Sequence, residues 1–161
     1  MANLKPARGG KMLAGVDCRD VAACTSLRLR RAARMTTQMF DAHLAPAELT
    51  IGQFGILTQL FAVSRPLTMK ELSDMIGMDP TTLNRTLKPL EMQKLISTAP
   101  DKQDRRARCI QLTAAGHKRL ARAMPLWRAA DAELRRTVGA ETTAALSGLL
   151  GLANEKLRKP E

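Results

Sequence analysis

Hydrophobic residues return every three or four positions along most of the chain, which is the spacing of one face of an α-helix. The first such pattern predicts a long helix from Asp17 to about His43, whose other side carries Arg28, Arg30, Arg31 and Arg34. The apolar stretch Leu49–Ala62 predicts a buried helix that starts at a capping box. Two further patterns predict long helices over about 114–137 and 141–158. Their apolar stripes need a surface to cover them.

The segment TMKELSDMIGMDPTTLNRTLK, between these helices, contains the signals of two short helices joined by a tight turn. Thr68 and Glu71 form a capping box that starts the first helix, and Gly77 can take the left-handed conformation that ends it. Asp79 can cap the second helix, and Pro80 occupies its first turn, where a missing N–H group is harmless. The segment is therefore predicted to be a helix-turn-helix.

The second of these short helices has an apolar side and a polar side. Leu83, Leu87 and Leu90 lie on the apolar side. The polar side carries hydroxyl, amide and cationic groups, which can bind base edges and phosphates in a DNA groove. Pro89 cannot donate a hydrogen bond to the carbonyl of Arg85, so we expect a bend there and base reading only before it. The residues expected to contact DNA here are Thr68, Thr81, Thr82, Asn84, Arg85 and Lys88. An ordinary solvated helix face is the alternative interpretation.

A polar turn flanked by two short apolar segments follows the helix-turn-helix. Leu95–Ala99 and Ala107–Leu112 predict two strands of a hairpin. A hairpin directly after a recognition helix is a wing, and the narrow minor groove of DNA attracts its cations. The wing residues expected to contact DNA are Lys102, Arg105, Arg106 and Arg108. The alternative is a solvated hairpin in which Asp101 and Asp104 pair with these arginines.

Composition and charge narrow the class of protein. The 161 residues can bury a real core, and 26 Lys and Arg against 15 Asp and Glu give a net charge of +11, which favours a polyanionic partner. Membrane-surface binding competes with this interpretation, but no apolar run is long enough to span a membrane. Three Phe, one Trp and no Tyr favour duplex DNA over single strands. The two histidines do not have the spacing of metal ligands, and the sequence contains neither a glycine-rich phosphate loop nor a plausible nucleophile–base pair. We therefore predict no enzymatic activity, no metal site and no cofactor.

The three cysteines, Cys18, Cys24 and Cys109, match neither a disulfide framework nor a zinc site, which favours a reducing, cytoplasmic setting. Cys24 and Cys109 are more simply interpreted as inert small apolar residues. Residues 1–16 carry no secretory signal and are predicted to be a disordered basic arm.

The predicted fold class is mainly α with a small β-hairpin wing, a winged helix-turn-helix with dimerisation helices at both ends. Residues 17–161 form a single domain in this prediction, with residues 47–116 as the DNA-binding part. The helices of 17–46 and 117–161 would pair with those of a second subunit, which covers their apolar stripes most simply. Such a dimer implies a roughly palindromic operator.

From about Val21 to Leu157, the sequence resembles the MarR (multiple antibiotic resistance regulator) family of bacterial transcription factors. The matching segments are LRRAAR at 29–34, LTIGQFGILTQL at 49–60, TMKELSDMIGMDPTTLNRTLKPLE at 68–91 and DKQDRRARCIQLTAAG at 101–116. The resemblance implies a cytoplasmic, nucleoid-associated homodimer, usually a repressor, whose DNA affinity falls when a small, often phenolic or aromatic, ligand binds between the dimerisation helices and the DNA-binding part. A pocket of that kind would draw on Arg34, Met35, Met39, Phe40, His43, Phe54 and Trp127. Core packing is the alternative role for the apolar members.

Two positions depart from the family pattern. The wing usually has the sequence Asp-x-Arg-Asp-x-Arg, and Gln103 occupies the position of its first arginine. Lys94 occupies the position of the glycine that usually precedes the first wing strand. In the redox-sensing branch of the family, the reactive cysteine would align with Ser26 rather than Cys24 when the sequences are registered on Arg34, and the accompanying tyrosines are absent. A ligand-responsive repressor is therefore the leading hypothesis. A cysteine-based redox regulator and a non-specific DNA-packaging protein are the alternatives.

Overall fold

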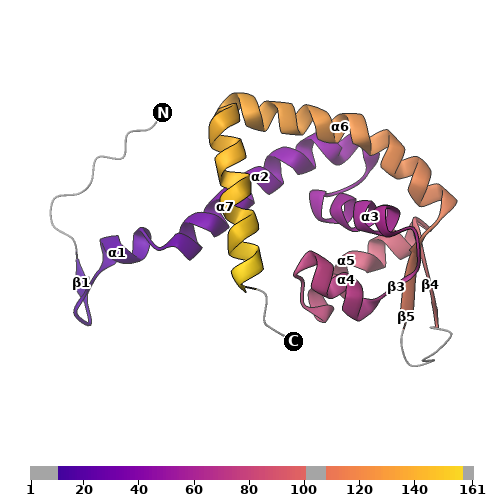
Figure 1. Cartoon of the computed structure of the whole chain (residues 1–161), viewed down its shortest axis with the longest axis horizontal. Coiled ribbons are helices and arrows are strands. Elements are labelled where there is room, and N and C mark those ends of the chain that lie inside the picture. Colours follow the sequence, from indigo (N-terminus) through magenta and orange to yellow (C-terminus); the bar gives the residue numbers. More distant parts are fainter. Residues whose placement is uncertain (1–10, 101–107, 158–161) are drawn as a thin grey trace. The chain divides into compact units, whose positions relative to one another are not determined.

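The computed structural model describes residues 11–100 and 108–157, and the chain divides into two units, residues up to Gln38 and residues from Met39 on (Figure 1). In chain order the elements are β1 (Met12–Leu13), β2 (Val16–Asp17), α1 (Cys18–Ala22), α2 (Thr25–Leu44), the 3-10 helix η1 (Ala45–Ala47), α3 (Ile51–Val63), β3 (Leu67–Thr68), α4 (Met69–Ile76), α5 (Pro80–Met92), β4 (Ile96–Pro100), β5 (Arg108–Leu112), α6 (Ala114–Val138) and α7 (Ala140–Leu157).

The prediction of one long helix that starts at Asp17 is wrong, because this stretch forms two helices. That side chain does cap a helix, α1, but α1 ends at Ala22 and α2 begins only at Thr25. The Cys24 N–H donates back to the Val21 carbonyl, and the Cys24 carbonyl accepts from the Arg28 N–H, so the helical ladder restarts there. The β-branched Thr25 that follows loses rotamer freedom in a helix, which favours a break at this point.

Part of the N-terminal arm that we predicted to be disordered forms an antiparallel pair of strands. Met12–Leu13 pairs with Val16–Asp17 across Ala14 and Gly15, both of which have positive φ. Two consecutive positive φ values are typical of the tight turn that joins hairpin strands. The prediction of disorder is therefore wrong for residues 12–16, and residues 1–10 lie outside the described part of the chain.

The core of the second unit lies where α3 meets the helix-turn-helix and the sheet. Figure 1 shows α6 along one side of α3, with α4 and α5 on the other. The side chains of Ile56, Leu57, Leu83 and Leu90 are fully buried there, as expected for an apolar helix at the centre of a domain. The capping box that we predicted before α3 is present, because Thr50 and Gln53 exchange hydrogen bonds.

Within the residues that the structure describes, the sheet of the second unit has three strands rather than the predicted two. Strands β4 and β5 form the expected antiparallel pair, with Thr98 opposite Ile110. The extra strand, β3, pairs with the other side of β5 and places Leu67 opposite Ile110. Both side chains are fully buried, so the sheet closes one side of the core. A strand of two residues leaves no alternating pattern in a sequence, which is why it was missed.

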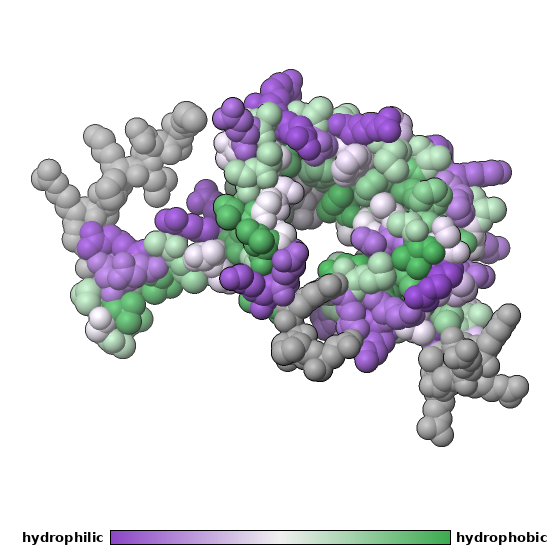
Figure 2. Space-filling view, viewed as in Figure 1, coloured by the Kyte–Doolittle hydropathy of each residue, from purple (hydrophilic) through white to green (hydrophobic). Residues whose placement is uncertain are grey.

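The two C-terminal helices begin near the predicted positions, but they leave much of their apolar surface exposed in the single chain. Leu120 of α6 is buried, whereas Val138, at the end of the same helix, is 40% exposed. Helix α7 buries no residue. Its predicted leucine stripe is exposed at Leu146, Leu149, Leu150 and Leu157. Figure 2 shows this apolar surface over the middle of α7.

We predict that Lys94→Gly stabilises the fold. Lys94 has a φ of 57°, in the left-handed region that penalises a Cβ atom, and its N–H donates to the Glu91 carbonyl. Removing the side chain should raise the free energy of unfolding by about 0.5 to 1 kcal/mol, after the larger entropy of an unfolded glycine is subtracted. Urea unfolding measures the change. Lys94→Ala keeps the Cβ atom, so an equal gain from that variant would contradict the explanation.

Candidate nucleic-acid interface

The second helix of the helix-turn-helix, α5, begins as its sequence predicts. The Asp79 carboxylate accepts hydrogen bonds from the backbone N–H groups of Thr81 and Thr82, at 3.1 and 3.0 Å. The bonds from Thr82, followed by the weaker one from Thr81, hold the pKa of Asp79 below its usual value. Gly77 ends α4 with a φ of 71°, so the tight turn has the predicted geometry.

Helix α5 separates a buried side from a polar side. Leu83, Leu87 and Leu90 are buried, whereas Thr81, Asn84, Arg85 and Lys88 are exposed and Thr82 is half-buried. Within the described residues, the Arg85 and Lys88 side chains make no hydrogen bond or ion pair. The helix continues through Pro89 to Met92. Unpaired cations on an exposed helix face can meet phosphates or base edges without first breaking an internal contact.

Thr68, another residue expected to contact DNA, makes hydrogen bonds within the protein to Glu71. Its hydroxyl donates to Glu71 Oε2 at 2.9 Å and accepts from the Glu71 N–H at 3.2 Å. Its own N–H donates to the same carboxylate at 2.7 Å. Arg65 Nη2 donates to Glu71 Oε1 at 2.7 Å, a contact that no sequence pattern revealed. The hydrogen bond from Arg65, followed by those from Thr68, lowers the pKa of Glu71 to about 2.

We expect this carboxylate to make stability depend on pH. The pKa of Glu71 is about 2 in the folded chain against 4.5 as its ordinary value, so the stabilisation is complete above about pH 4.5 and is lost as pH falls toward 2. The Glu71 side chain is 39% exposed, which reduces the effect to about 1 kcal/mol after solvent screening. Glu71→Gln keeps an acceptor in the capping box but cannot ionise. Urea unfolding from pH 5 to 3 should show a shallower loss for the variant, and parallel profiles would contradict the assignment.

The base of the wing is tied to the recognition helix. Arg108 Nη2 on β5 lies 2.9 Å from Thr98 Oγ1 on β4 and 3.4 Å from Glu91 Oε1 on α5, and Thr98 Oγ1 also donates to Glu91. The side chain of Arg108 remains 62% exposed. Among the described residues, the acidic partner of this arginine is Glu91, which no short-range sequence pattern could identify. The wing residues expected to contact or pair at the tip, Asp101, Lys102, Gln103, Asp104, Arg105 and Arg106, lie outside the described residues.

The residues predicted to form a ligand pocket fall into both units. Arg34 and Met35 lie in the first unit and are exposed. In the second unit, Met39 is half-buried and Phe40 is buried. The rings of Phe54 and Trp127 stack with centroids 6.1 Å apart. The His43 Nε2 atom lies 2.6 Å from Glu133 Oε2, a partner that the sequence did not reveal. Phe54 belongs to the hydrophobic core and Trp127 packs against it, in keeping with the alternative role of core packing.

The three cysteines differ in exposure. Cys18 and Cys24 are exposed, whereas Cys109 on β5 is half-buried. In residues 11–100 and 108–157, no three His, Cys, Asp or Glu side chains gather where they could hold a metal ion. No helix in the same residues is both long and apolar enough to cross a membrane.

The capped recognition helix and the sheet behind it define a winged helix-turn-helix protein that binds DNA. The MarR family model matches residues 49–107. The HTH-type transcriptional regulator YybA of Bacillus subtilis strain 168 is 30% identical over 125 residues, which cover 78% of this chain and 75% of that protein. The chain belongs to the MarR family and is a DNA-binding transcriptional regulator of that type.

Solved structures extend the similarity over most of the chain. The transcriptional regulator MosR of M. tuberculosis, in complex with DNA, is 36% identical, with a TM-score of 0.70 and coverage of 84% of this chain and 99% of that one. The transcriptional repressor CouR, bound to a 23-mer DNA duplex, is 26% identical, with a TM-score of 0.73 and coverage of 86% of this chain and 97% of that one.

Some sequence relatives match over a shorter stretch. An HTH-type transcriptional regulator of Bacillus anthracis is 34% identical over 99 residues, which cover 62% of this chain and 65% of that protein.

Proposed function

We propose that this protein is a homodimeric repressor that binds a specific, roughly palindromic DNA site and is released from it by a small ligand. The observation that carries the proposal is the exposed polar face of α5, opposite the buried side of Leu83 and Leu87. The similarity to MosR in complex with DNA and to the repressor CouR on its duplex supports the same conclusion. In this proposal, Thr81, Thr82, Asn84, Arg85 and Lys88 face the major groove, while the wing cations hold phosphates or the minor groove.

The first test is a selection of DNA fragments from the source genome. A repressor should prefer its own site over random duplexes by about 10³-fold or more at physiological salt. A DNA-packaging protein would show the same loss of affinity with salt but no preferred duplex. Selection without enrichment of any sequence would therefore contradict the proposal. Transcription from a promoter that carries the selected site then distinguishes a repressor from an activator.

The second subunit is proposed because the last two helices expose apolar surface. Leu149 is 66% exposed and Leu146 is 43% exposed on α7, although both are large apolar residues. Pairing with the same helices of a second copy would bury them, and each buried leucine contributes about 1.5 to 3 kcal/mol. The terminal helices therefore serve dimerisation in this proposal, and residues 47–116 serve DNA binding.

We predict that Leu149→Glu weakens the dimer. A charge in an apolar interface is costly, and this side chain has no core contact to lose within the single chain. Sedimentation equilibrium should show a mass near 17.6 kDa for the variant at concentrations where the natural sequence gives twice that value. Thr142→Glu, on the exposed first turn of the same helix, is the matched control. An unchanged dimer in Leu149→Glu would place the interface elsewhere.

Ligand release is proposed from the family resemblance, with a small aromatic or phenolic compound as effector. Within the second unit, the candidate pocket draws on the residues around Phe54, Trp127 and His43. A screen for compounds that free the selected duplex tests this part. Variants at His43 should then change the effective concentration of the compound without changing DNA affinity in its absence. Failure of every class of small aromatic compound would contradict ligand release while leaving DNA recognition in place.

A further inference from the structure

The chain enters the DNA-binding part near Ala47 and leaves it near Thr113, and one arginine lies close to both places. The 3-10 helix η1 leads into α3, and Thr113 leads from β5 into α6. Arg119, in the second turn of α6, contacts η1 and also the end of the recognition helix α5. No sequence pattern pointed to this residue, because its partners lie 26 to 72 residues away.

The guanidinium of Arg119 binds acceptors from two separate segments. Its Nη1 atom donates to the Ala47 carbonyl at 3.0 Å and to Gln93 Oε1 at 3.3 Å, and Gln93 is the C-cap of α5. The same atom donates to Glu48 Oε2 at 2.7 Å. Glu48 is 72% exposed, so this ion pair contributes little to stability by itself, whereas the side chain of Arg119 is only 19% exposed. One side chain of α6 therefore joins the start of the DNA-binding part to the end of its recognition helix.

The segment that follows α5 is bonded to both α5 and α6. The Leu95 N–H donates back to the Leu90 carbonyl at 2.9 Å. From the α6 side, Thr113 Oγ1 donates to the Lys94 carbonyl at 2.7 Å, and the Thr113 N–H donates to the Leu95 carbonyl at 3.1 Å. A change in the angle of α6 is therefore passed to the end of α5 through this short segment.

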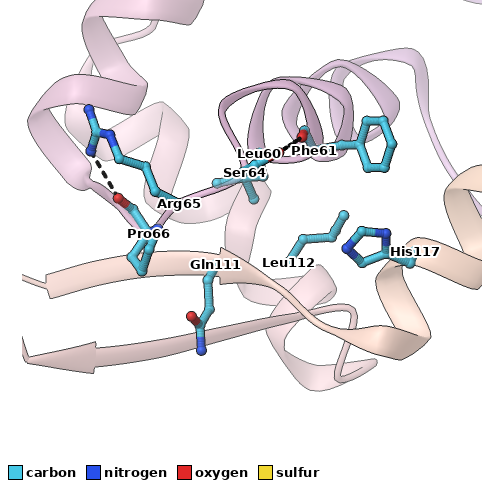
Figure 3. A pocket seen from close by; sticks show the side chains of 8 residues that line it. All are labelled: Leu60, Phe61, Ser64, Arg65, Pro66, Gln111, Leu112 and His117. Atoms are coloured by element: carbon cyan, nitrogen blue, oxygen red, sulfur yellow. Dashed lines mark hydrogen bonds between the residues drawn. The ribbon is translucent and has the colours of Figure 1, made fainter.

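The start of α6 also contacts α3. The His117 ring meets the Phe61 ring edge to face, with centroids 5.4 Å apart and planes at 73°, and Figure 3 shows the two rings facing each other. Side chains two positions apart on an α-helix point about 200° apart, so His117 and Arg119 hold α6 from different sides. The Arg119 contact is the one of these two that includes the recognition helix.

We propose that Arg119 is a positioning residue that fixes the angle between the recognition helix and α6. In a dimer, this angle sets the distance between the two recognition helices, because α6 leads into α7 and its exposed leucines. Arg119 thereby selects the spacing of the two half-sites without contacting DNA itself. The effect on spacing rests on the homodimer proposed above, whereas the effect on the end of α5 does not.

Amide hydrogen exchange of the full chain without DNA, followed by NMR, tests the effect on the end of α5. In Arg119→Ala, the amides of Lys94 and Leu95 should exchange about tenfold faster, and Arg119→Lys should retain part of the protection. Gln93→Ala removes only the acceptor on α5, at an exposed position, and should give a similar local change in a fully folded protein. Arg122→Ala, on the exposed side of α6, is the matched control and should change neither amide. Unchanged exchange in both Arg119→Ala and Gln93→Ala would overturn the proposal.

Duplexes that differ only in half-site spacing provide a readout that a merely structural role would leave unchanged. One added or removed base pair moves a half-site by about 3.4 Å and turns it by roughly 35° about the DNA axis. The natural sequence should prefer its own spacing by about tenfold. Arg119→Ala and Gln93→Ala should reduce this preference to about threefold or less, because the recognition helices are no longer held in place before binding. Arg122→Ala should keep the full preference.

The two measurements separate this proposal from the homodimer on which the spacing depends. A natural sequence with no spacing preference would contradict the proposed homodimer, and amide exchange would then decide the role of Arg119. If the natural sequence has the preference and Arg119→Ala keeps it unchanged, Arg119 only stabilises the fold and the proposal is wrong. Thermal unfolding of each variant identifies that case, because a purely structural role lowers the melting temperature without changing the spacing preference.

Discussion

Gly116→Ala is expected to lower the free energy of unfolding by about 3 kcal/mol or more, because this glycine has no room for a side chain. A Cβ atom there would lie 2.1 Å from the Leu95 carbonyl oxygen and 2.6 Å from Leu112 Cδ1. The leucine side chain could rotate away, but the carbonyl is backbone. It also accepts the Thr113 N–H at 3.1 Å, so moving it disturbs the junction of β4 with α6.

The measurement is urea unfolding of Gly116→Ala beside a second glycine variant. Gly55→Ala is the matched control, because Gly55 also lies in a helix of the same unit and no atom lies within 4 Å of the place that its Cβ atom would take. Alanine is a better helix former than glycine by about 1 kcal/mol, so the control should be neutral or stabilised. Similar losses in both variants would contradict a steric explanation.

Local signals in the sequence predicted the ends of the central helices well. Thr50, Thr68 and Asp79 all cap the helices that follow them, because a cap needs only a side chain within two or three residues of its amide partners. Gly77 takes the predicted left-handed conformation for the same reason. Such interactions are complete within a few residues, so they can be read before the fold is known.

Contacts between distant segments could not be read in this way. The pairing of Glu91 with Arg108 joins residues seventeen apart, and it exists only because β5 returns beside the end of α5. The close approach of Gly116 to Leu95 leaves no pattern in a sequence, since glycine also occurs where no space is short. The break after Ala22 was missed because the apolar spacing continues across it.

Arg85→Ala is expected to reduce the affinity for the preferred duplex by about 10- to 100-fold and the affinity for random DNA much less. Arg85 is exposed on α5 and, within the described residues, holds no internal partner, so its loss should leave the fold intact. Its guanidinium can donate two hydrogen bonds to the paired acceptors of guanine, a contact worth about 1 to 3 kcal/mol. Arg85→Lys keeps the charge but not this fork, and we expect it to lose specificity as well.

Fluorescence anisotropy with the selected duplex and a shuffled duplex, at several salt concentrations, separates base reading from phosphate binding. Arg106→Ala, a wing variant suggested by the sequence, should weaken binding to both duplexes nearly equally. It should also reduce the slope of log affinity against log salt concentration by about one. Arg122→Ala, on the exposed side of α6, should change neither. If Arg85→Ala lost equal affinity for both duplexes, Arg85 would bind phosphate rather than a base. The base contacts would then have to come from the shorter side chains of Thr81 and Asn84 on the same face of α5.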